Sequence, residues 1–320
     1  MTGRGERPDG TVSWRELLAE AEAVLGGRPG GALDARRIVE DVAGATGAEL
    51  LDVLDDLVTV RGVARFDALV ARRRAGEPLQ YVLGHWAFRR LDLFVDRRVL
   101  IPRPETELVA EIALAEVDRI ARSRTPVRVA DLGTGSGALA LAVASERPVT
   151  EVWATDVSDD ALAVARANLA ALGRSATRVR IGAGSWFAAL PADLAGRLDV
   201  IVSNPPYVAD GDVLDPEVAD WEPGLALRAG PRGLDALEVV VAGAGRWLAE
   251  DGALVVELAP DQAHVVADLA RASGFDAVDV LTDLTGRDRI VRARRGPGGG
   301  AVSSAGHDRV EGGPDAAAHR

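Results

Sequence analysis

Several residue types are absent from this chain of 320 residues. There is no cysteine, so neither disulfides nor thiolate metal sites can form. Every one of the 37 basic residues is arginine, because lysine is also missing. The four histidines are scattered, and none of their spacings resembles a pair of metal ligands; they are His85, His264, His307 and His319. The sequence therefore predicts no bound metal.

The chain also has fewer basic residues than acidic ones, 37 against 49. The formal net charge is −12 and the sequence pI is about 4.9. Such a chain repels phosphate backbones at long range, which argues against direct binding to nucleic acid. No run approaches the ~18 apolar residues of a membrane helix, and the polar start lacks the apolar core of a signal peptide. We expect a cytoplasmic protein that does not associate with membranes.

The first part of the chain has a helical pattern. Apolar residues recur at helical spacing after Ser13, and Glu16 stands three residues later, as in a capping box. We predict a helical domain over residues 1–76 that recognises the substrate. Besides the helix after Ser13, the predicted helical segments are 35–43, 50–57 and 64–74.

A short segment with several aromatic residues follows. Trp86, Phe88 and Phe94 stand among aliphatic residues, which is typical of a β-hairpin or an extended linker. Arg103 lies between two prolines, and the second of them pushes its backbone toward extended geometry. We predict a β-hairpin linker over residues 77–104.

Residues 105–295 alternate between strand and helix patterns. This alternation predicts an α/β fold with a mostly parallel sheet and helices on both faces. The predicted strands are 127–132, 151–156, 179–181, 198–203, 253–258, 276–281 and 289–292, and the predicted helices are 137–145, 159–172, 234–249 and 261–272. Residues 296–320 are rich in Gly, Ala and Asp without periodicity, and we predict a disordered tail.

A glycine-rich turn links the first of these strands to its helix. It reads Gly133-Thr134-Gly135-Ser136-Gly137, and glycine lets the backbone approach a ligand closely. Asp156 ends the next strand, where an acid can bind ribose hydroxyls. The turn and the acid predict a nucleoside cofactor, but they fit NAD and S-adenosylmethionine equally well.

A second motif favours S-adenosylmethionine. The strand 198–203 runs into Asn204-Pro205-Pro206-Tyr207 at the same edge of the sheet. An amide nitrogen is a poor nucleophile because its lone pair is delocalised. The Asn204 side-chain oxygen and the Pro205 carbonyl can accept its two N–H bonds and aim the nitrogen at an electrophilic methyl group. Tyr207 can pack against the substrate side chain, and the sulfonium needs no metal.

With these residues the chain resembles the HemK/PrmC family, the N5-glutamine methyltransferases of peptide-chain release factors. The likeness covers about residues 74–292. It rests on the segments 76–84 and 99–107, on Phe88 between them, on the two motifs above with Asp156, and on Glu222-Pro223, Gly233-Leu234-Asp235 and the segments 283–284 and 286–289.

The resemblance implies a Rossmann-like class I methyltransferase sheet, a small N-terminal helical domain, a β-hairpin linker and a monomeric enzyme. It implies S-adenosylmethionine as cofactor, with S-adenosylhomocysteine as product. The substrate would be the glutamine of the Gly-Gly-Gln loop in class I release factors. The implied site residues are Gly133, Thr134, Gly135, Ser136, Gly137, Asp156, Trp186 and Asn204 for the cofactor, Asn204, Pro205, Pro206 and Tyr207 for the substrate, and Asn204, Pro205 and Tyr207 for catalysis.

The chain departs from the family pattern at Ser185, where the family often has an acid before Trp186. A serine can still form a hydrogen bond there, but a contact with adenine is in doubt.

Two neighbouring functions stay open at this point. One is methylation of a ribosomal-protein glutamine, and the other is adenine-N6 methylation of nucleic acid, which uses a similar Asn/Asp-Pro-Pro-aromatic motif. The acidic charge and the small helical domain disfavour the second. A non-catalytic S-adenosylmethionine sensor would not need the Asn204 motif, and neither would an NAD-dependent oxidoreductase.

Overall fold

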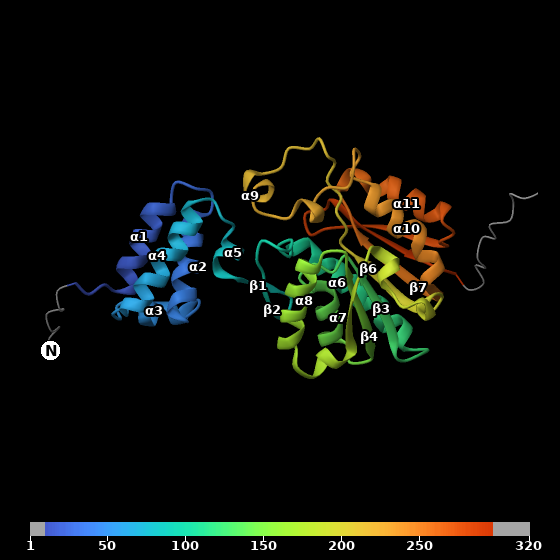
Figure 1. The fold of residues 1–320 in the computed structure, drawn as a ribbon, viewed down its shortest axis with the longest axis horizontal. Helices are drawn as coiled ribbons and strands as arrows, with labels where there is room; N and C mark the ends of the chain where they lie inside the picture. Colours follow the sequence, from blue (N-terminus) through green and yellow to red (C-terminus); the bar gives the residue numbers. More distant parts are fainter. Residues whose placement is uncertain (1–9, 297–320) are drawn as a thin grey trace, which may run out of the picture.

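A computed structural model describes residues 10–296 (Figure 1). The predicted disordered tail lies outside the described residues except for Gly296.

Five helices form the N-terminal part of the described residues, 10–84. Their apolar faces enclose a core that includes Leu17, Ile38 and Phe66. The Ser13 backbone N–H donates to the Glu16 carboxylate at 2.8 Å, which confirms the predicted capping box. The helices are α1 (Trp14–Leu25), α2 (Gly31–Ala43), α3 (Ala48–Val53), α4 (Val60–Arg74) and α5 (Leu79–Leu83).

Three helices of this part differ from the prediction, and one of them, α3, covers Ala48–Val53 instead of residues 50–57. Helix α2 starts at Gly31 and α4 at Val60, each four residues earlier than the apolar spacing indicated. The reason at α4 is a cap, since the Thr59 hydroxyl accepts the Gly62 N–H at 3.1 Å. The first turn of α4 is exposed at Val60 and Arg61, and apolar periodicity misses an exposed turn.

The predicted linker holds a helix as well as a hairpin. Helix α5 lies within residues 77–104 and contributes Leu79 and Val82 to the helical core. Strands β1 (His85–Phe88) and β2 (Leu91–Phe94) then pair antiparallel. The Asn168 side chain accepts the Phe94 N–H at 2.7 Å and donates to the Phe94 carbonyl at 3.0 Å. This pair of bonds anchors the hairpin to the larger α/β unit.

The described residues after the hairpin contain one seven-stranded sheet, as predicted. The strand order is β5-β4-β3-β6-β7-β9-β8, with the last two strands antiparallel to their neighbours. The strands are β3 (Val127–Leu132), β4 (Thr150–Asp156), β5 (Val179–Ala183), β6 (Leu198–Ser203), β7 (Leu248–Glu257), β8 (Ala277–Thr282) and β9 (Asp288–Arg294).

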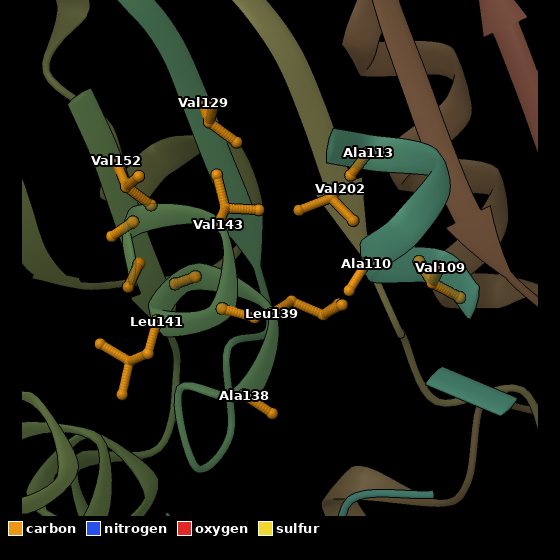
Figure 2. Close-up of a cluster of buried hydrophobic side chains, with 14 of the residues drawn as sticks. Val109, Ala110, Ala113, Val129, Ala138, Leu139, Leu141, Val143, Val152 and Val202 are labelled. Carbon is orange, nitrogen blue, oxygen red and sulfur yellow. The ribbon is translucent and has the colours of Figure 1, made fainter. Parts of the chain in front are cut away.

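Helices cover both faces of this sheet (Figure 1). Alternate residues of strand β6 pack on opposite faces of the sheet. Val200 and Val202 belong to one hydrophobic cluster and Ile201 belongs to the other. Figure 2 shows Ala110 of α6 and Leu139 of α7 meeting near Val202. One layer contains α6 (Pro104–Ala121), α7 (Ala138–Glu146) and α8 (Asp159–Ala171), and the other contains α10 (Asp235–Trp247) and α11 (Ala263–Ala272).

Helix α6 is not among the elements predicted from the sequence. It begins at Pro104, which is favourable at the first helical position, and Glu105 and Glu107 lie in its first turn. Its residues Val109, Ala113 and others face the sheet at helical spacing. Arg103 is extended, as its position before Pro104 predicted, and it is the N-cap of α6.

Within residues 10–296, no helix combines the length and the apolar character needed to cross a bilayer.

Candidate active site

The two predicted motifs lie side by side because their strands are neighbours. Strands β3 and β6 pair in parallel, so the glycine-rich turn and Asn204 leave the sheet at the same edge. The Ser203 hydroxyl reinforces this by donating to the Leu132 carbonyl at 2.6 Å. A cavity of about 550 Å³ opens at this edge, which is within the usual range for small-molecule sites.

The glycine-rich turn depends on left-handed backbone conformations. The φ angles are +73° at Gly133, +55° at Gly135 and +88° at Gly137. A Cβ atom on Gly133 would make only an ordinary contact with the Trp186 ring, at 3.5 Å, so the positive φ rather than a lack of space favours glycine there. Residues 133–136 line the cavity, whereas Gly137 is not among the lining residues and instead caps α7.

Asp156 faces both the turn and the cavity. One of its carboxylate oxygens accepts the Gly135 N–H at 2.9 Å, and the other accepts the Ser158 N–H at 2.9 Å. A carboxylate has about four acceptor positions, so two remain for a ligand. Asp156 therefore shapes the turn and lines the cavity at once.

Trp186 and Ser185 follow strand β5 and also line the cavity. Trp186 opens the 3-10 helix η2 (Trp186–Ala189) with φ +47°, a rare conformation for a bulky residue. It is half-buried and packs against the second core cluster. The structure thus gives Trp186 both a packing role and a face toward the cavity.

Asp131 belongs to this site, although the sequence analysis did not select it. Asp131 lies two residues before Gly133. Its Oδ2 accepts the Thr134 hydroxyl at 2.6 Å and the Ala140 N–H at 3.0 Å. Its Oδ1 is buried and has no partner among the described residues. Burial raises the pKa of this carboxyl to about 7. Its signal in the sequence was an acid at a strand end, two residues before the first glycine.

Asn204 presents an acceptor without a partner. Its Nδ2 donates to the Thr106 hydroxyl oxygen at 3.1 Å, whereas its Oδ1 is buried and has no partner within residues 10–296. A buried acceptor left without a hydrogen bond is costly and calls for an explanation. Because Asn204 lines the cavity, a ligand with an N–H group can supply the missing donor.

The other residues of the motif are placed differently. Pro206 lines the cavity, whereas Pro205 is buried and Tyr207 is half-buried, and neither is among the lining residues. The Tyr207 hydroxyl donates to Glu257 Oε1 at 3.2 Å. Burial and the nearby Glu257 carboxylate raise the pKa of Tyr207, so it stays protonated at neutral pH.

The segment after the motif covers one side of the cavity. Its ends are joined where Val208 donates to the Leu227 carbonyl at 2.9 Å, and Pro223 and Leu225 line the cavity. Glu222 forms an ion pair with Arg103 and accepts the Ile101 N–H at 3.1 Å. Two segments that carried the family likeness therefore meet here.

This covering segment also contacts the helical domain. Its helix α9 (Pro216–Ala219) carries Glu217, which pairs with the buried Arg73 of α4. Arg73 also pairs with Asp34 of α2 at 2.6 Å. The Arg97 guanidinium lies 4.5 Å from the centre of the Trp221 ring. The helical domain is therefore tied to the segment that borders the cavity (Figure 1).

No group of three or more His, Asp or Glu side chains suited to a metal ion occurs in the described part of the chain.

Comparisons with known proteins agree with this geometry. A protein-family model described as "PrmC N-terminal domain" matches residues 16–84, and another family model, described as "Methyltransferase small domain", matches residues 114–220. Among solved structures, the catalytic domain of hMettl16 in complex with MAT2A 3′UTR hairpin 6 has a TM-score of 0.50. It is 14% identical and covers 74% of this chain and 82% of that one, which is a likeness of fold alone.

Curated relatives are much closer in sequence. The release factor glutamine methyltransferase of Cereibacter sphaeroides is 43% identical over 265 residues, covering 82% of this chain and 91% of the relative. That of Deinococcus radiodurans is 42% identical over 288 residues, covering 89% and 99%. The chain belongs to the release factor glutamine methyltransferase family.

Proposed function

We propose that this protein transfers a methyl group from S-adenosylmethionine to the side-chain amide nitrogen of the glutamine in the Gly-Gly-Gln loop of class I release factors. The observation that carries the proposal is the Asn204 Oδ1 atom. It is buried and finds no partner among residues 10–296, at a cavity that the glycine-rich turn and Asp156 also line. A primary amide supplies the N–H donor that this atom lacks.

The residues of the cavity fit the cofactor. The partnerless Asp131 Oδ1 is suited to the ammonium group of its methionine part, because a buried carboxylate is stabilised by an opposite charge. The remaining acceptor positions of Asp156 suit ribose hydroxyls, and the Trp186 ring offers a surface for adenine. Residues 133–136 would contact the methionine part. When bound, S-adenosylmethionine supplies a methyl group on a positively charged sulfur.

The chain itself supplies orientation at the substrate nitrogen. The Asn204 Oδ1 and the Pro205 carbonyl accept its two N–H bonds, which turns its lone pair toward the methyl carbon. Pro206 restricts the backbone of Pro205 and has no N–H that could compete for the carbonyl. Held in this way, the amide nitrogen would take the methyl group that the cofactor supplies and would give up one proton to water. No metal takes part.

The wider arrangement supports a protein substrate. The net charge of −12 disfavours a nucleic-acid partner, and the helical domain borders the segment that covers the cavity. We further propose the domain division predicted from the sequence, with α5 added to the helical part, and a monomer that acts in the cytoplasm.

Methyl transfer from labelled S-adenosylmethionine to a purified class I release factor tests this function. A second sample of the factor carries alanine in place of the Gly-Gly-Gln glutamine. We expect label on the intact factor alone. Label on both would move the reaction to another residue, and label on neither would overturn the assignment of the substrate. Ribosomal protein and nucleic acid, run beside them, test the two neighbouring functions.

A further inference from the structure

Three side chains form a hydrogen-bonded network behind Asn204. The Thr106 hydroxyl, on the first turn of α6, donates to Glu257 Oε2 at 2.7 Å. The Asn204 Nδ2 donates to Thr106 Oγ1 at 3.1 Å, and the Tyr207 hydroxyl donates to Glu257 Oε1 at 3.2 Å. Thr106 is 4% exposed and Glu257 is 1% exposed, so water cannot easily replace either partner.

When Glu257 is ionised, as at pH 8, the donors and acceptors of this network allow one orientation of the Asn204 amide. A threonine hydroxyl has one hydrogen, and Thr106 gives it to the Glu257 carboxylate. Only lone pairs of Thr106 then face Asn204. The amide nitrogen satisfies them, whereas the amide oxygen would be repelled. The Asn204 Oδ1 must therefore point away from Thr106.

We infer that Thr106 and Glu257 are positioning residues, which hold the Asn204 amide with its oxygen toward the substrate nitrogen. This inference rests on the proposed function. Glu257 also holds the Tyr207 hydroxyl, so a single carboxylate orients two residues of the motif. Neither Thr106 nor Glu257 needs to touch the substrate to do this.

The environment of Glu257 agrees with such a role. Strand β7 ends at Glu257, next to β6, and this places its carboxylate behind the motif. Each oxygen of the buried Glu257 carboxyl accepts from a hydroxyl donor, which offsets part of the cost of its burial. The same low-dielectric surroundings strengthen the bonds and so restrict the geometry.

A matched pair of variants at Thr106 tests the inference. Valine has the shape of threonine without the hydroxyl, and serine keeps the hydroxyl. We expect Thr106→Val to lower kcat for the release factor by roughly 10- to 100-fold, because misplaced reacting groups lose rate of this order. S-adenosylhomocysteine affinity, measured by calorimetry at pH 8, should stay within about twofold. Thr106→Ser should recover most of the turnover.

A double-mutant cycle separates positioning from simple structural support. If Thr106 acts through Asn204, Thr106→Val should have almost no further effect on kcat in an Asn204→Ala background. Multiplicative losses would overturn the inference, and so would turnover in Thr106→Val equal to that of the wild type.

A second pair covers the event that Thr106→Val does not fold. In Glu257→Leu the Thr106 hydroxyl has no carboxylate to bind and can donate to Asn204 Oδ1, which turns the amide inward. In Glu257→Gln the side-chain oxygen can still accept from Thr106. We expect kcat to fall at least about 10-fold further in the leucine variant than in the glutamine variant, and equal values would refute the inference. If the wild-type enzyme fails to methylate the factor, the proposed function fails instead.

Discussion

The Ser203 hydroxyl donates a 2.6 Å hydrogen bond to the Leu132 carbonyl, joining the end of strand β6 to the end of β3. Leu132 directly precedes the glycine-rich turn, and Ser203 directly precedes Asn204. This one bond therefore ties the proposed cofactor site to the proposed substrate site, inside a region that is fully buried at both residues.

Replacement of Ser203 by alanine should weaken this junction. We expect Ser203→Ala to lower the free energy of unfolding by about 1 kcal/mol, the usual net worth of a buried hydrogen bond. We also expect a several-fold loss of kcat, because the two motifs lose part of their registration. Denaturant unfolding and methyl-transfer assays measure the two effects. Ser145→Ala is a matched control, since the Ser145 hydroxyl binds only the Ala142 carbonyl of its own helix. Equal stability and turnover in both variants would contradict the prediction.

Removal of the Asn204 amide should abolish most turnover while the cofactor still binds. Loss of one preorganised polar contact at a reacting centre typically costs roughly 10²–10³ in rate. We expect this loss in Asn204→Ala at saturating S-adenosylmethionine. Calorimetry with S-adenosylhomocysteine should give an affinity close to that of the wild type. Near-normal turnover would refute the mechanism with two acceptors.

Asp156 should matter for cofactor affinity. A hydrogen bond to a charged group contributes about 1.5–3 kcal/mol, so Asp156→Ala should weaken S-adenosylhomocysteine binding by that amount. Part of the loss will come from the turn, because Asp156 also holds the Gly135 N–H. Asp156→Asn keeps one acceptor oxygen and should lose less. A dissociation constant that is the same in all three proteins would rule out the ribose contact.

Glu257 should make stability depend on pH. Burial raises its pKa from the ordinary 4.5 to about 7, against the opposing effects of the Thr106 and Tyr207 hydroxyls and of Arg289, while Glu105 adds to the rise. The folded chain thus favours the protonated form. This contribution to stability is complete below about pH 4.5 and is lost as the pH rises through about 7.

At high pH the ionised Glu257 carboxylate lowers the stability of the folded chain. Glu257→Gln removes this effect and separates it from the similar effect of Asp131, whose pKa is also raised. Each kcal/mol corresponds to roughly 2–4 °C in a domain of this size. We expect the variant to melt a few degrees above the wild type at pH 8 and to lose that advantage by pH 5. Thermal unfolding at both pH values measures the difference, and a variant that is less stable at pH 8 would contradict the assigned direction.

Much of the site could be predicted from the sequence because its signals are local. The glycines mark a turn that needs positive φ, and the prolines fix the backbone after Asn204. Asp156 ends strand β4, and its position can also be read from the sequence. Parallel strands bring their carboxyl ends to one edge, so the three features could be expected to meet before any coordinates were known.

The residues at which helices begin were predicted less well than the residues of the site. Helix α4 begins at a capping threonine and α6 at a proline, and neither signal follows apolar spacing. Apolar periodicity reports which face of a helix is buried, and it gives little information about the residue at which a helix starts.

By itself, then, the sequence determined the residues at the carboxyl edge of the sheet. They are the glycine turn, the acid at the end of the next strand, and an asparagine followed by two prolines. Only the tertiary structure decided which side chains support them. Thr106 and Glu257 lie 151 residues apart in the chain, and Arg73 lies 144 residues from Glu217. Contacts between such distant segments follow from how helices and strands pack, and packing leaves no periodic pattern in the sequence that could mark a threonine, a glutamate or an arginine as a partner.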